Sequence, residues 1–199
     1  MRSLLWVSES VKVGLLLAAG LSTRFAGQNK LLAPLRGKPL VTHAASVLDS
    51  MDLDHLIAVT ADREVERHLK GFEIVHHPHP EQGQGTSLAL GAQTASRYEA
   101  SRLLVLLADM PFVTQAHCGA VLRRCTDVFA SASLFGERPM PPACFPASML
   151  TELSQRTGDE GARQLIAALP PSALVEAPGW TLDDIDTADD LARHERQDR

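Results

Sequence analysis

The chain has 199 residues, of which 45% are hydrophobic and 22% are charged, so it is long and apolar enough to bury a core. The formal net charge of −5 and the lack of any Lys/Arg run exclude an extended nucleic-acid-binding surface. These totals predict one globular domain over residues 1–199.

Three cysteines and no CxxC pair argue against a disulfide framework and against a zinc site. No segment approaches the roughly 20 consecutive apolar residues that a membrane-spanning helix needs. We therefore expect a soluble protein of the reducing cytoplasm.

Short apolar runs in the first two thirds of the chain predict strands at residues 13–18, 56–60, 73–75 and 103–108. Helical spacing between and after them predicts helices at residues 39–51, 64–70, 87–98 and 114–129. Strands that alternate with helices are typical of a parallel sheet with helices on its faces. The run "LLVLLA" at 103–108 is apolar without alternation, which indicates a central strand covered on both faces.

After residue 130 the pattern is less regular and richer in proline. We expect a strand at 131–135, a short edge strand at 144–145, helices at 147–153 and 162–169, a strand at 174–176 and a final helix from Thr187. The prolines of "GERPMPPAC" exclude the middle of a sheet but allow its edge.

Two polar loops follow predicted parallel strands, "GLSTRFAGQNK" after 13–18 and "ADMP" after 103–108. Open α/β sheets bind ligands at the carboxyl ends of their strands, so these loops mark the expected site. The first loop matches neither GxxxxGK[ST] nor GxGxxG. Its small residues still allow backbone N–H groups to surround an anion, and Arg24 and Lys30 add two cations that suit a polyphosphate. The alternative, on charge pattern alone, is a solvated turn.

The stretch "LLLAAGLSTRFAGQNKLLAPLRGKPLV" resembles the signature of the MobA-like nucleotidyltransferases, roughly LxAGxSxRxGxxKxLxxxxGxPL. The matching positions are Ala19, Gly20, Ser22, Arg24, Gly27, Lys30, Gly37, Pro39 and Leu40. One extra residue lies between Arg24 and Gly27, which changes the tip of the loop. The resemblance implies a three-layer α/β/α, Rossmann-like fold of the GT-A type with a mostly parallel sheet.

Four later motifs extend the resemblance over residues 13–193: "GQGTSLALGA", "LLADMPFVT", "TGDEGARQLI" and "DIDTADDLAR". The set is most similar to the molybdenum cofactor cytidylyltransferases. This resemblance implies that the N-terminal half binds CTP and that the C-terminal half binds a phosphorylated acceptor, the molybdopterin form of the molybdenum cofactor. The implied reaction transfers CMP to that acceptor and releases pyrophosphate. Alternatives are transfer of another nucleotide to a sugar phosphate or other small phosphate, and non-catalytic nucleotide binding.

Three aspartates are candidates for a metal site. Asp109 ends an apolar strand, and Asp184 and Asp186 lie two residues apart, so in an extended segment both can face one cation. Mg²⁺ prefers a few carboxylates together with water and phosphate oxygens. The alternative is that "DIDTADDL" simply begins a helix, with Asp186 or Thr187 as the N-cap.

The resemblance also assigns a role to each candidate residue. The residues implied in nucleotide binding are Ala18, Ala19, Gly20, Ser22, Gly83, Thr86 and Ser87. Arg24 and Lys30 are implied in catalysis, and Asp109 and Asp186 in binding Mg²⁺. For "HHPHP" at 76–80 we expect a surface loop without metal, and for Cys144 a packed small side chain.

Overall fold

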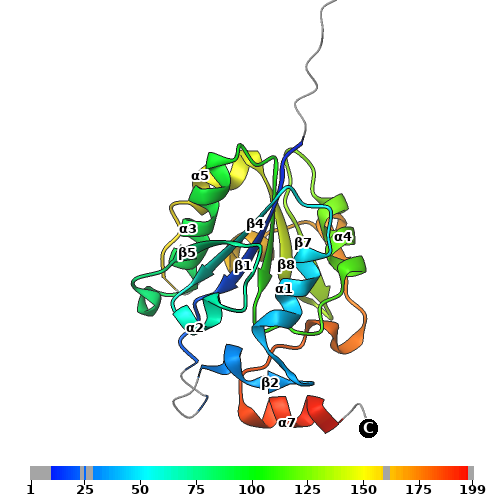
Figure 1. Ribbon diagram of the computed structural model, residues 1–199. Helices are drawn as coiled ribbons and strands as arrows, with labels where there is room; N and C mark the ends of the chain where they lie inside the picture. The colour runs from blue at the N-terminus through cyan, green and yellow to red at the C-terminus, as the bar shows by residue number, and fades with distance from the viewer. Residues whose placement is uncertain (1–9, 23–24, 26–28, 159–161, 197–199) are drawn as a thin grey trace, which may run out of the picture.

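The computed structural model describes residues 10–22, 25, 29–158 and 162–196, and it contains a seven-stranded sheet with the order β5-β4-β1-β6-β8-β7-β9 (Figure 1). The strands are β1 (Lys12–Ala18), β4 (His55–Thr60), β5 (Glu73–His76), β6 (Arg102–Leu107), β7 (Ser131–Phe135), β8 (Arg138–Pro146) and β9 (Leu174–Glu176). β1 pairs in parallel with both β4 and β6, β4 pairs in parallel with β5, and β9 pairs in parallel with β7. Only β8 runs antiparallel to its neighbours, so the sheet is mostly parallel.

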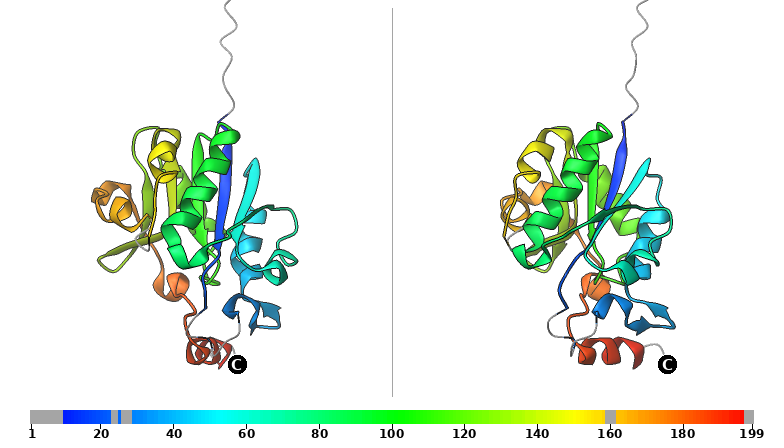
Figure 2. Two further views of the ribbon diagram at one scale, coloured as in Figure 1. Left: turned by 90° about the vertical axis from the view of Figure 1, so that its left-hand side faces the viewer. Right: turned by 60° about the vertical axis from the view of Figure 1, so that its left-hand side comes forward.

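Helices cover both faces of the sheet and give the expected three layers (Figure 2). The helices are α1 (Val41–Asp49), α2 (Arg63–Glu66), α3 (Gln84–Arg97), α4 (Gln115–Arg124), α5 (Leu150–Leu153), α6 (Arg163–Ala167) and α7 (Ala188–Arg196). One buried cluster holds α1, α2 and α4 against one face, and a second holds α3, α5 and α6 against the other. Side chains of β1 alternate between the two clusters, because successive residues of a strand point to opposite faces.

The periodicity predicted most of these elements, including β6 as a central strand, but two helices end earlier than predicted and one strand lies elsewhere in the sheet. The helix predicted over 64–70 ends at Glu66. The helix predicted over 114–129 ends at Arg124, because Thr126 forms a turn in which its hydroxyl accepts the Phe129 N–H at 2.9 Å. The hydroxyl and the backbone thus close a turn where the helix would have continued.

The proline-rich strand β8 lies inside the sheet, between β6 and β7, and not at an edge as predicted. Its pairing with β7 shifts register between Ala132 and Ser133, and Pro141 and Pro142 lie in that irregularity. The pairing with β6 begins only at Ala143. The two prolines therefore occupy positions where neither neighbouring strand needs their missing N–H group.

At the carboxyl edge of β1 and β6 lie a small hairpin, β2 (Pro34–Leu35) with β3 (Lys38–Pro39), and α7 (Figure 1). Phe112 connects α7 to the rest of this edge, since its ring centroid lies 4.4 Å from that of His194 and 5.1 Å from that of Trp180. This packing fixes the segment that leads into α7.

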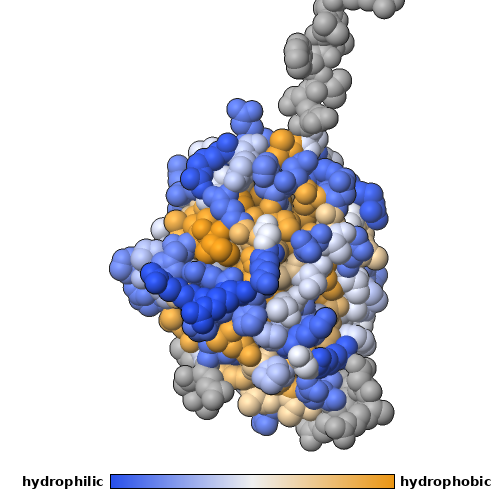
Figure 3. All heavy atoms as spheres, viewed as in Figure 1, coloured by the Kyte–Doolittle hydropathy of each residue, from blue (hydrophilic) through white to orange (hydrophobic). Residues whose placement is uncertain are grey.

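Polar and apolar residues are mixed on the surface seen in Figure 3, where apolar patches lie between hydrophilic ones. Among the described helices, none is long and apolar enough to cross a membrane.

Gly91 is where α3 makes a close approach to β1. A methyl group at this position would lie 2.4 Å from Leu15 Cδ2, and Leu15 is fully buried. Gly91→Ala is expected to lower the free energy of unfolding by about 1–3 kcal/mol, because the buried leucine must shift. The matched control is Gly119→Ala in α4, where the nearest atom is the flexible Arg123 guanidinium and helix propensity favours alanine. Urea denaturation measures both, and equal effects would contradict the packing argument.

Candidate active site

The two loops predicted to form the site lie at the same edge of the sheet. Leu17 of β1 pairs with Leu107 of β6, so the residues that follow these strands emerge side by side. Ala19 and Gly20 follow the first strand, and Asp109 follows the second. The parallel pairing of β1 and β6 thus builds the site that the chain order predicted.

A short 3₁₀ helix, η1 (Lys30–Leu32), begins at Lys30 and places its side chain in the site. Asn29 caps this helix: its Oδ1 accepts the Leu31 N–H at 3.0 Å, and its Nδ2 donates to Asp62 at 2.8 Å. The Ser22 hydroxyl accepts the Lys30 N–H at 3.1 Å. Ser22 and Asn29 therefore fix the start of η1 and the direction in which Lys30 leaves it.

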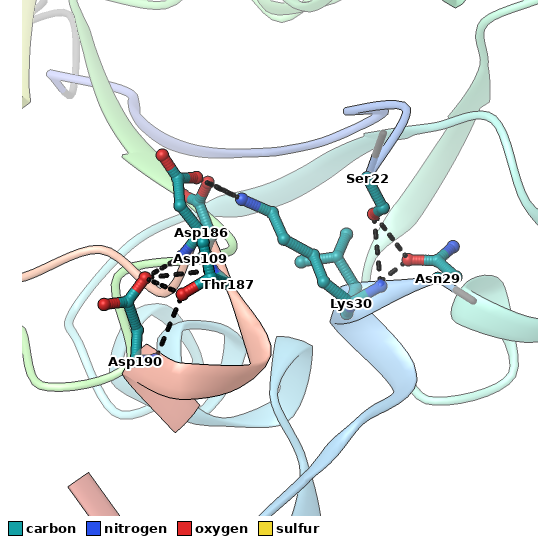
Figure 4. Close-up of polar contacts among 8 residues, drawn as sticks. Ser22, Asn29, Lys30, Asp109, Asp186, Thr187 and Asp190 are labelled. Carbon is teal, nitrogen blue, oxygen red and sulfur yellow. Dashed lines mark hydrogen bonds and ion pairs between the residues drawn. The ribbon is translucent and has the colours of Figure 1, made fainter. Parts of the chain in front are cut away.

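The Lys30 ammonium lies between two carboxylates (Figure 4). Its Nζ is 2.8 Å from Asp109 Oδ2 and 2.8 Å from Asp186 Oδ1. Burial opposes the charge on Lys30, but the two carboxylates outweigh it, so the pKa of Lys30 is raised above its ordinary value. Lys30 thus remains a cation although its side chain is only 11% exposed.

Two backbone devices bring Asp186 to this point. The Ile185 N–H donates to the Asp109 carbonyl at 2.9 Å, which ties the two acidic segments together. Thr187 and Asp190 then exchange hydrogen bonds: the Thr187 N–H donates to Asp190 Oδ2 at 2.9 Å, and the Asp190 N–H donates to Thr187 Oγ1 at 3.1 Å. The segment therefore does begin a helix, yet Thr187 provides the cap and the Asp186 carboxylate faces Lys30.

Asp184 lies nearby but does not share this ion pair. Its carboxyl is half-buried and lines a neighbouring hollow. Burial, followed by the negative charges of Asp186 and Asp109, raises the pKa of Asp184. Asp184 is therefore a weaker acid than an ordinary aspartate, and it forms no ion pair with Lys30.

Asp109 and Asp186 are suited to a divalent cation. Two carboxylate oxygens already converge on one cationic group, the Lys30 ammonium. Within the residues that the structure describes, no three His, Cys, Asp or Glu side chains form a complete metal cage. Two carboxylates leave a divalent cation free to complete its shell with water and phosphate oxygens.

A small pocket of about 100 Å³ opens beside these residues. Its lining includes the predicted residues Ala18, Ala19, Gly20, Lys30, Gly83, Ser87 and Asp109. It also includes Pro80 and Gln84, for which no role in nucleotide binding was predicted. The strand ends and the first turn of α3 thus meet around one space.

Among the described residues, Ser22, Thr86 and Asp186 were predicted as site residues but do not line this pocket. The Thr86 hydroxyl donates to the Gly83 carbonyl at 2.6 Å and contacts His77, so it acts behind the loop. Ser22 binds the backbone of η1, as described above. Arg24 lies outside the described residues.

A second hollow of about 130 Å³ adjoins the first, and the two share Leu17, Gln84 and Leu107. Its far wall comes from β8 and α6, where Phe145 and Ile166 provide apolar surface and Arg138 and Arg163 provide positive charge. One end of the sheet therefore carries two connected cavities.

His77, Asn29 and Asp62 also belong to the site's support and were missed by the sequence analysis. The stretch 76–80 was predicted as an exposed loop, but His77 is 3% exposed. The stretch HHPHP has no helical or strand periodicity from which the burial of His77 could be predicted. The burial becomes visible only in the contact of His77 with Thr86 of α3.

A parallel sheet whose carboxyl edge carries a small-residue pocket, a buried lysine and two converging carboxylates defines an α/β protein of the nucleotidyltransferase class. Residues 14–173 match the MobA-like NTP transferase domain. The chain therefore belongs to the MobA-like NTP transferase family and is a nucleotidyltransferase, as its motifs predicted.

Two relatives are similar to this chain over most of its length. "Purine catabolism protein PucB" of Bacillus subtilis (strain 168) is 32% identical over 194 residues, which is 89% of this chain and 93% of that protein. A "Probable molybdenum cofactor guanylyltransferase" of Haloferax mediterranei is 30% identical over 141 residues, 67% of this chain and 64% of that protein.

Solved structures share the fold across nearly the whole chain. Rv0371c from Mycobacterium tuberculosis H37Rv superposes with a TM-score of 0.79 at 26% identity, covering 93% of this chain and 97% of that one. A second structure of Rv0371C, in complex with manganese, has a TM-score of 0.74 at 24% identity and covers 92% of this chain and 98% of that one.

Proposed function

We propose that this nucleotidyltransferase transfers CMP from CTP to the molybdopterin form of the molybdenum cofactor and releases pyrophosphate. The observation that carries the proposal is the ion pair of Lys30 with Asp109 and Asp186, in which Lys30 and Asp109 also line the small-residue pocket. A phosphate oxygen of the acceptor attacks the α-phosphorus of CTP. The bond from that phosphorus to the pyrophosphate oxygen breaks, and its electron pair leaves with pyrophosphate, so no protein nucleophile is needed.

The residues of the pocket have distinct roles in this proposal. Lys30 stabilises the charge that grows on the departing β- and γ-phosphates, and Arg24 assists it. Asp109 and Asp186 hold Mg²⁺, which when bound neutralises phosphate charge. Gly20 is assigned to phosphate or ribose binding, since it lines the pocket and a methyl group at this position would meet no atom of the described residues within 4 Å. Protein packing therefore leaves space at Gly20 that a nucleotide would use.

The second hollow is proposed as the acceptor site. It adjoins the nucleotide pocket through shared residues, so an acceptor phosphate there is near the α-phosphorus. Arg138 and Arg163 supply positive charge for that phosphate, and Phe145 supplies an apolar surface for a ring system. The N-terminal half would thus bind the nucleotide and the C-terminal half the acceptor, within one domain.

We also place the reaction in the cytoplasm. Cys118, Cys125 and Cys144 are free thiols in the structure, and all three are buried. Free cysteines suit a reducing compartment.

Pyrophosphate release tests the proposal directly. The purified protein with Mg²⁺ is offered CTP, GTP, UTP and ATP, each with and without molybdopterin cofactor or a sugar phosphate. Release from CTP that depends on molybdopterin supports the proposal, whereas release with a sugar phosphate favours the related activity. Binding of nucleotide without release in any combination indicates a non-catalytic protein. The names of the relatives, for purine catabolism and for guanylyl transfer, make the nucleotide panel essential.

Ala19 is expected to favour a pyrimidine over a purine. Ala19 is 6% exposed and lines the nucleotide pocket, so its methyl group limits the space that glycine would leave. One methyl group contributes about 1–3 kcal/mol, which corresponds to a preference of tens-fold to a hundredfold. Ala19→Gly should relax the ratio of kcat/KM for CTP and GTP without abolishing activity. A wild-type enzyme that prefers GTP contradicts this interpretation.

A further inference from the structure

His77 is a buried histidine that the proposed reaction does not use. It follows β5, and its backbone N–H donates to the Thr60 carbonyl of β4 at 2.6 Å. Its neighbours His76 and His79 are exposed, with side chains 53% and 62% accessible. Only the middle histidine of "HHPHP" is therefore turned into the protein.

The hydrogen bonds of His77 define its tautomer. The His79 N–H donates to His77 Nδ1 at 3.1 Å, so Nδ1 carries no proton. The Thr86 hydroxyl uses its proton to donate to the Gly83 carbonyl at 2.6 Å. The remaining contact, 2.7 Å between His77 Nε2 and Thr86 Oγ1, is then a hydrogen bond donated by Nε2–H. The four groups form a directed chain that requires a neutral imidazole.

This chain ends on the loop that enters the nucleotide pocket. Gly83 precedes α3 with a φ of +94°, a backbone conformation that favours glycine, and it lines the pocket with Gln84. The other side of α3's first turn is also held, because the Gly85 N–H donates to the Gly158 carbonyl at 2.7 Å. The Gly83 carbonyl is thus held by hydrogen bonds that run from His77 through the Thr86 hydroxyl.

We propose, on the basis of the proposed nucleotide pocket, that His77 is a positioning residue for nucleotide binding: its neutral imidazole orients the Thr86 hydroxyl, which holds the Gly83 loop in its binding conformation. His77 does not touch the nucleotide. Protonation of Nδ1 would replace the acceptor of the His79 N–H with a donor and break the chain at its first link.

The surroundings of His77 keep it neutral at ordinary pH. Burial lowers the pKa of His77 below 6.5; Glu81 opposes this, and His79 and His76 reinforce it. Arg156 lines the same surface hollow, and the first turn of α3 carries no acidic residue. Because the folded-state pKa lies below the ordinary value, the neutral form persists at neutral pH and is lost only on acidification below about pH 6.5.

Three variants test the chain through nucleotide affinity. His77→Phe keeps the ring and removes both nitrogens, and Thr86→Val keeps the shape and removes the hydroxyl. Each is expected to raise the Kd and KM for CTP about tenfold with kcat within about twofold of wild type. The double variant should bind CTP no less tightly than the single variant with the lower affinity, because both substitutions break the same chain of hydrogen bonds. Wild-type affinity in folded His77→Phe, or additive losses in the double variant, would overturn the inference.

A pH series gives a second readout that does not depend on a disruptive substitution. In calorimetric titrations from about pH 7.5 to about pH 5.5, the affinity for CTP should fall more steeply in wild type than in His77→Gln. Protonation of the triphosphate affects both proteins equally, whereas glutamine can donate to Thr86 but does not titrate. His79→Gln is the matched control, because it removes an exposed imidazole from the same loop and should keep the wild-type loss. An identical pH dependence in His77→Gln and wild type would refute the role of His77. If wild type binds no nucleoside triphosphate at pH 7.5, the proposed function fails instead.

Discussion

Asp109→Asn is expected to reduce Mg²⁺-dependent turnover about a thousandfold or more. The substitution keeps the shape of the side chain and removes one of the two carboxylates that converge on the Lys30 ammonium. A site that holds its cation through two carboxylates loses most of its metal affinity with either one, and metal neutralisation of phosphate charge contributes several kcal/mol. Turnover measured across a Mg²⁺ titration should show a lower maximum and a higher half-saturating concentration.

Asp186→Asn should have a similar effect, and the double variant should be little worse than either single one, because both residues serve one site. Asp184→Asn is the matched control. Asp184 lies two residues before Asp186 and lines the second hollow, so its substitution should reduce turnover far less. Activity that survives chelation by EDTA would contradict the proposed role of the metal.

Lys30→Ala is expected to lower kcat by roughly a hundredfold or more while the protein remains folded. The proposed role of the ammonium is to stabilise charge that increases in the transition state, so its loss acts on turnover more than on CTP affinity. Lys30→Arg is the control that keeps the charge but changes its geometry, and it should retain more activity than alanine. Single-turnover kinetics and circular dichroism separate the two effects. A folded alanine variant with normal turnover would exclude Lys30 from catalysis.

The parallel half of the fold could be predicted because its signals are local. β1 and β6 are continuous apolar runs of the kind that both-face burial requires, and the helices between them have clear spacing. The interior position of β8 could not be predicted in the same way. The interior position depends on a register shift opposite Ala132 and Ser133, which accommodates the prolines. The sequence alone does not indicate which residues of β7 pair with which residues of β8.

The site divides similarly. Lys30 and Asp109 could be identified because each lies in a motif beside a strand end, and the structure brings them to 2.8 Å. The resemblance implied a nucleotide-binding role for Thr86, and the structure shows that its hydroxyl is held between Gly83 and His77. Which way a hydroxyl points depends on its tertiary partner, and His77 becomes a partner only when the segment after β5 folds against α3.

The most direct test of the central claim follows the α-phosphate of CTP. CTP labelled at the α-phosphate is incubated with the wild-type protein, Mg²⁺ and molybdopterin cofactor, and the products are separated. We predict that the label moves into a cytidylylated acceptor in equal amount to the pyrophosphate released, and that Asp109→Asn and Lys30→Ala suppress both products together. Label recovered as unreacted CTP, or as free CMP with no acceptor adduct, would contradict the account.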